Sequence, residues 1–130
     1  MPTIATWFNQ RIPEILAHEH FSTYDSRLFD AEDHIGLNAN NERLLIPGMV
    51  VAISTVTNNY VPYSPTASYG AGSDTPVGLL TDMHNCTLGD KLIEPIWHGR
   101  VHLGDCYVYG QPPGTISAVI RAALDDIEWI

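Results

Sequence analysis

A turn pair is followed directly by an apolar run at Pro47-Gly48-Met49-Val50-Val51-Ala52-Ile53. Pro-Gly is a typical turn signal, and the run after it is typical of a strand. Asn58-Asn59 is a second turn signal, after which Tyr60-Val61-Pro62-Tyr63 returns to extended structure. The sequence therefore predicts strands at 49–53 and 60–63, with a turn between them.

Further short strands are predicted on the C-terminal side of these two. Residues 64–76 are mostly Ser, Thr, Gly, Ala and Pro, which predicts a loop. His98-Gly99 lies between two later apolar runs and is expected to form a hairpin or a bulged corner. The later strands are expected at residues 77–80, 91–97, 100–103 and 107–109.

One helix is predicted near the C-terminus, with Thr115 as its N-cap. It is expected to run for about three turns and to end at Asp125-Asp126. Residues 127–130 are expected to return as an edge strand. We therefore predict a mainly β fold with one C-terminal helix, that is, a β-rich α+β fold. The apolar face expected on the helix is Ile116, Val119, Ile120, Ala123, Leu124 and Ile127.

Residues 1–46 differ from the rest of the chain in composition and pattern. They contain little Gly and have an apolar stripe at helical spacing, which Pro13 interrupts. We predict an N-terminal arm over 1–46 and a β-rich domain over 47–130. Two interpretations of the arm stay open. The stripe packs on the chain's own β domain, or it orders on a partner, with the polar connector 36–43 giving it reach. The stripe consists of Ile4, Trp7, Phe8, Ile12, Ile15 and Leu16.

Charge and composition restrict the function of the chain. Its 130 residues carry a net charge of −9, with six Lys and Arg against fifteen Asp and Glu. With so few Lys and Arg, the chain lacks the basic surface with which a free-standing nucleic-acid binder contacts phosphates. No stretch has the length of a membrane span, and the N-terminus lacks a signal-peptide pattern. We expect a protein made in a reducing cytoplasm, with Cys86 and Cys106 as thiols.

Histidines and cysteines form the best candidate for chemistry. His84, His98 and His102 are residue types that bind zinc or iron, with Cys86 and Cys106 nearby in sequence. Their spacing matches no established metal motif, and ordinary loop and strand residues are the competing interpretation. A small metal-binding β-barrel protein or enzyme that uses the three histidines is therefore kept as the alternative function, and our main expectation is no metal and no cofactor.

Other candidate sites are weaker. His18-Glu19-His20 would share a face only on a strand, whereas its surroundings favour a helix. Asp125, Asp126 and Glu128 are interpreted as a solvated acidic patch, since they lie near the end of a helix. No nucleophile elbow is present. We therefore expect that the chain is not an enzyme and has no catalytic residues.

The order of elements in the last two-thirds of the chain resembles the head-decoration proteins of the phage lambda type. An opening strand is followed by a short strand that contains proline, a turn-rich loop, a Val-Gly-Leu-Leu strand and a strand–Gly–strand element. A Pro-bounded helix and a short C-terminal strand complete the series. The stretches that carry the likeness are Pro47–Ala52, Tyr60–Pro65, Pro76–Leu80, Leu92–His102 and residues 115–130.

This resemblance implies a capsid cement protein of phage virions, a viral protein that is made in the host cytoplasm and binds the outer capsid surface. Its partners would be the major capsid protein and copies of itself in a homotrimer, with a homodimer as the alternative, and neither nucleic acid nor membrane. Residues 1–46 depart from the family pattern. We expect the six apolar arm residues named above to bind the capsid. The expected oligomer-interface residues are Tyr60, Tyr63, Trp97 and Trp129. A bacterial binding module or adaptor of unknown ligand is a third possibility.

Overall fold

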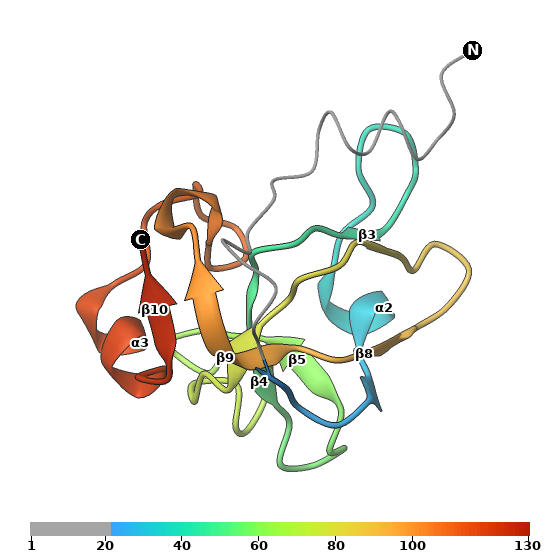
Figure 1. Cartoon of the computed structure of the whole chain (residues 1–130). Helices are drawn as coiled ribbons and strands as arrows, with labels where there is room; N and C mark the ends of the chain where they lie inside the picture. The colour runs from blue at the N-terminus through green and yellow to red at the C-terminus, as the bar shows by residue number, and fades with distance from the viewer. Residues whose placement is uncertain (1–21) are drawn as a thin grey trace.

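The computed structural model describes residues 22–130 and is mainly β, as the sequence predicts (Figure 1). Two short α-helices and one 3-10 helix join the strands. The elements are β1 (Ser22–Thr23), β2 (Arg27–Leu28), α2 (Ala31–His34), β3 (Leu44–Leu45), β4 (Val50–Ile53), β5 (Tyr60–Pro62), β6 (Gly78–Leu79), β7 (His84–Asn85), β8 (Leu92–Ile93), β9 (Ile96–Val101), η1 (Leu103–Asp105), α3 (Ala118–Ala123) and β10 (Ile127–Trp129).

Six of the described strands form the main sheet, in the order β1-β9-β6-β4-β5, with β10 pairing with β9. All pairs are antiparallel except β10 with β9, which is parallel. One row of paired residues crosses four of the strands, from Thr23 through Ile96 and Leu79 to Val50. Two smaller pairs, β2 with β8 and β3 with β7, lie outside this sheet.

The β4–β5 hairpin confirms the two strands predicted first. Ile53 lies opposite Tyr60, and the Ser54 N–H donates to the Asn59 carbonyl at 2.9 Å to close the turn. Asn58 has a φ of 61°, in the left-handed region, which Asn tolerates better than most residues. Asp30 supports the turn from outside, because its carboxylate accepts hydrogen bonds from Thr57 and Asn59.

The hairpin considered at His98-Gly99 does not form. The chain passes through both residues as one strand, β9, because each half of that strand has its own partners. Ile96 and His98 pair with β1, and Gly99–Val101 pair with β10. The pairing of β9 with β1 shifts register between His98 and Ile96, so an irregularity does lie beside the predicted corner.

The C-terminal helix is shorter than predicted. It begins after Ser117, whose Oγ accepts a hydrogen bond from the Ile120 N–H, and it ends at Ala123. Thr115 is not the cap, since its hydroxyl donates instead to the Pro112 carbonyl at 2.7 Å. Val119, expected on the apolar face, is 74% exposed. The predicted edge strand is confirmed as β10.

The core consists of two clusters of buried residues, and β4 lies between them. Val50 and Ala52 belong to the first cluster, and Met49 and Val51 belong to the second. Because successive side chains of a strand point to opposite faces, β4 is buried on both sides. The first cluster includes residues of α3 and β10, and the second includes residues of α2 and β8, which lie on opposite sides of β4 (Figure 1).

Residues 22–46 are part of this fold, which differs from the predicted division into an arm over 1–46 and a domain from 47. Phe29, Ala31 and Leu45 are fully buried in the second cluster, and Ile35 is 4% exposed. The strands β1 and β2 pair with β9 and β8. The second core cluster contains side chains from both sides of residue 46. Among the described residues, a boundary at 46 therefore does not divide the chain into two separately packed parts.

Candidate functional site

An apolar groove of about 340 Å³ among the described residues is a candidate binding site. Its lining comes from two stretches of chain, one around β3 and the start of β4, the other following η1. Apolar and aromatic side chains dominate it, with Asp105 as its charged member. Concave, mostly apolar surfaces of this size are typical of binding sites. The lining is Leu44, Ile46, Met49, Asp105, Tyr107, Tyr109, Gly110, Gln111 and Pro113.

Hydrogen bonds to the main chain fix the two tyrosines of the groove. The Tyr107 hydroxyl donates to the Ile46 carbonyl at 2.7 Å, and the Tyr107 N–H donates to the Gly48 carbonyl at 2.9 Å. The Tyr109 hydroxyl accepts from the Gly36 N–H at 3.1 Å. Burial raises the pKa of Tyr107, so its hydroxyl stays protonated. Both rings therefore offer apolar surface, while their polar atoms are already engaged.

The turn at Pro47-Gly48 brings the two stretches of the groove together. Gly48 has a φ of 99°, which glycine adopts readily, and a Cβ there would collide with the backbone oxygen of Asp105. The close approach lets Met49 form a bridge with Tyr107. The sequence identified this turn, but the pairing with Tyr107 joins residues far apart in the chain, and no local signal reveals it.

The four predicted interface residues lie in different environments. Tyr60 is fully buried, and its hydroxyl donates to the Asp25 carbonyl at 2.8 Å, while Tyr63 is 5% exposed in the first core cluster. Trp129 is partly buried against the same cluster. Trp97 is 36% exposed, and its indole N–H donates to the Thr23 carbonyl. Only the two tryptophans therefore keep surface that another copy of the chain can contact.

The predicted capsid-binding residues of the arm lie outside the described residues. The structure therefore places none of Ile4, Trp7, Phe8, Ile12, Ile15 and Leu16. The pair His18 and His20 lies outside them as well.

The histidines of the alternative metal site do not form a cluster. Within residues 22–130, no group of three or more His, Cys, Asp or Glu side chains is arranged to hold a metal ion. Cys86 and Cys106 are buried and free, and the Cys106 thiol donates to the His102 carbonyl. Burial lowers the pKa of His84, which keeps its imidazole neutral.

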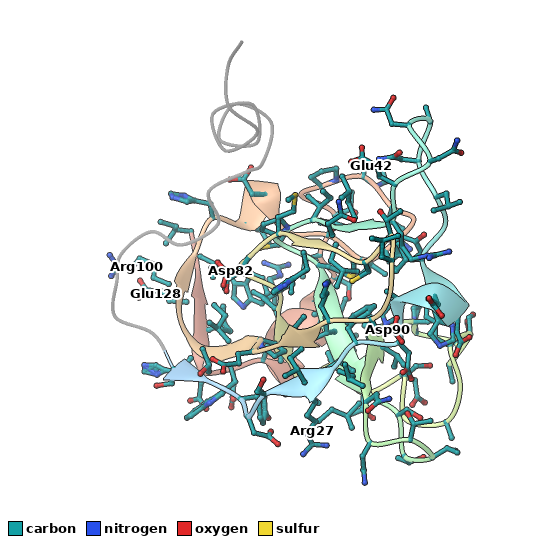
Figure 2. All side chains as sticks on the ribbon, turned by 90° about the vertical axis from the view of Figure 1, so that its right-hand side faces the viewer. Arg27, Glu42, Asp82, Asp90, Arg100 and Glu128 are labelled. Carbon is teal, nitrogen blue, oxygen red and sulfur yellow. The ribbon has the colours of Figure 1, made fainter. Side chains whose placement is uncertain are left out.

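Several charged side chains have a structural partner. Asp90 accepts hydrogen bonds from the Ala31 and Glu32 N–H groups at the start of α2. Arg100 on β9 and Glu128 on β10 form an ion pair at 3.1 Å, and the two labels lie side by side in Figure 2. Such exposed pairs contribute about 0–1 kcal/mol.

No protein-family model matches the chain, and the search of curated proteins found no match either. Among residues 22–130, no helix has the length and apolar character needed to cross a membrane. The likeness to head-decoration proteins therefore rests on the sequence stretches and their order.

Proposed function

We propose that the chain is a phage head-decoration protein that binds the outside of an expanded capsid and stabilises its shell. The observation that carries the proposal is the succession of elements. The hairpin β4–β5, a turn-rich loop, β6, β9, α3 and β10 occur in this order in the described chain, with β7 and β8 between β6 and β9 and η1 before α3. This is the order of elements that the resemblance to the lambda-type family implies.

The character of the surface supports a binding role. The groove lined by Met49 and Tyr107 is apolar, and its tyrosine hydroxyls are engaged with the main chain. Such a surface suits contact with another protein more than it suits proton transfer or nucleophilic attack. The net charge of −9 would steer the chain toward a basic partner surface.

The decoration protein is proposed to act as a homotrimer, with a dimer as the alternative. The exposed part of Trp97 and the half-buried Trp129 are the interface candidates that burial leaves available. We expect Trp97→Ala to weaken self-association by about 2 kcal/mol or more, as for a typical hot-spot residue. Light scattering over a concentration series measures this, with Val56→Ala, a substitution at an 81% exposed residue of the β4–β5 turn, as the matched control.

The proposed contact with the capsid includes the apolar residues of the N-terminal segment. We expect Trp7→Ala to reduce affinity for heads by about 2 kcal/mol or more. Bridging of neighbouring coat subunits by many copies stabilises the assembled shell by mass action.

Co-sedimentation tests the proposal directly. Expanded heads and unexpanded shells, both assembled from one phage major capsid protein, are mixed with the purified protein. We expect saturable pelleting with the expanded heads. Absence of pelleting with either particle at micromolar concentration contradicts the proposal.

A further inference from the structure

The apolar groove between β3 and the stretch after η1 has no occupant among the described residues, although its lining is suited to aromatic side chains. Ile46 and Leu44 are half-buried, and neither is a member of the two core clusters. Tyr107 and Tyr109 lie opposite them with their polar atoms engaged. The groove therefore presents apolar surface to solvent. Burying this surface would contribute about 25 cal/mol of stabilising free energy for each Å² removed from water.

The groove lies within reach of the N-terminal segment. The described chain begins at Ser22, next to Thr23 in the row of paired residues that ends at Val50. Three strand spacings separate the ends of this row, or about 14 Å. Met49, which lines the groove, is the neighbour of Val50. The six residue-to-residue steps from Leu16 to Ser22 alone span up to about 20 Å when extended.

One charged residue of the groove and one of the segment can pair. Asp105 is the charged residue of the groove lining. Arg11 is the only Lys or Arg among the first 21 residues of the sequence, which also hold Glu14 and Glu19, and it follows Trp7 and Phe8 within four positions. An arginine at this position can meet the carboxylate while the two aromatic side chains enter the apolar part.

We propose that in the free protein the groove is the docking site of the chain's own N-terminal segment. Trp7 and Phe8 fill the apolar groove beside Ile46 and Tyr107, and Arg11 pairs with Asp105. The docking is intramolecular and reversible. It concerns the free chain, and it stands whether or not the protein binds phage heads.

Fluorescence of Trp7 tests the docking in the full chain. The background is Trp97→Phe with Trp129→Phe, which makes Trp7 the only tryptophan. Trp129 Nε1 is buried with no hydrogen-bond partner among the described residues, so phenylalanine loses no such bond there. We expect Trp7 to emit at short wavelength and to resist quenching by acrylamide, with both properties unchanged on dilution.

Substitutions in the groove identify where Trp7 is held. Ile46→Glu should move the emission to longer wavelength and raise the quenching constant several-fold. Leu92→Glu, at a 60% exposed residue of β8 outside the groove lining, is the matched control and should change neither. Circular dichroism checks that both variants fold.

A charge reversal keeps the test valid even where Ile46→Glu fails to fold. Arg11→Glu should raise the quenching of Trp7, and Arg11→Glu combined with Asp105→Arg should restore protection. Three results would overturn the proposal. The first is that Trp7 emits and is quenched like a solvent-exposed tryptophan in the parent background. The second is that Trp7 resists quenching but that neither groove substitution changes this. The third is that its resistance to quenching disappears on dilution, which would assign the groove to a second copy.

Discussion

Gly78 shows how one residue can set the spacing of the central sheet. It lies in β6 between β4 and β9, and a Cβ at this position would collide with the backbone oxygen of Ile96. Because the clash is with main chain and not with the end of a flexible side chain, neighbouring atoms cannot simply rotate away. The β6–β9 pairing therefore requires glycine at this position.

We expect Gly78→Ala to lower the free energy of unfolding by about 1–3 kcal/mol or more, the usual cost of overpacking. Urea denaturation measures the change. The matched control is Gly36→Ala, because a Cβ at Gly36 meets nothing within 4 Å. Equal stabilities of the two variants would contradict the close approach of β6 and β9.

Cys106 makes the fold sensitive to alkaline pH. Burial raises the pKa of its thiol to about 12, whereas the thiol of an unfolded chain titrates near about 8.5. Above pH 9 the unfolded chain has therefore lost a proton that the folded chain retains. Fewer protons on the unfolded state mean that the free energy of unfolding falls as pH rises, by up to about 1.4 kcal/mol per pH unit for this group.

The pH dependence can be assigned to Cys106 by substitution. Urea titrations between pH 8 and pH 10 should show a shallower decline for Cys106→Ala than for the parent chain. Burial also raises the pKa of Tyr60 to about 12, which adds to the decline above about pH 10 in both proteins. An unchanged slope for Cys106→Ala would show that its thiol titrates normally in the folded state.

At the scale of elements, the N-terminal strands and α2 are structural. Phe29 is fully buried in the second core cluster, and truncation of a buried phenylalanine alone costs about 3–5 kcal/mol. Removal of residues 1–43 also deletes Ala31, Ile35 and the pairings of β1 and β2. A typical domain has only about 5–15 kcal/mol of stability to lose.

We therefore expect the chain that starts at Leu44 to be unfolded or aggregated. The matched truncation starts at Ser22, retains all residues of both described core clusters, and should unfold cooperatively. Circular dichroism melting curves compare the two proteins. A cooperative transition for the chain starting at Leu44 would restore the arm boundary at residue 46.

Elements built from local signals are the ones that the sequence predicted well. The strands β4, β5 and β6 and the returning strand β10 follow turn residues and apolar runs that are visible in the chain. Val119 was misplaced because helical spacing alone does not reveal that α3 covers the core with only a few side chains. The strands β1 and β2 have two residues each, too few to establish a period.

The candidate site was hidden for a similar reason. Met49 and Tyr107 form a bridge although more than half of the described sequence separates them, and no spacing rule connects the two positions. Tyr60 and Tyr63 were expected at an interface because aromatic residues are common there. They are buried instead because side chains from residues 22–46 and from α3 cover the two faces of the sheet.

At the scale of the whole molecule, two core clusters share strand β4, so the chain is a single packing unit over the described residues. This unit presents an apolar groove and the exposed Trp97, and the sequence as a whole has a net charge of −9. A single packed unit with apolar contact surfaces suits a protein that bridges neighbouring subunits.

Heat-triggered release of DNA from phage heads tests the central claim most directly. Filled heads lacking this protein are compared with the same heads after addition of the purified chain, and DNA release is followed with an intercalating dye during heating. We predict that decorated heads release their DNA at a clearly higher temperature, and that the increase saturates with the amount of bound protein. Equal release temperatures for bare heads and for heads with the chain bound would contradict the assignment as a decoration protein.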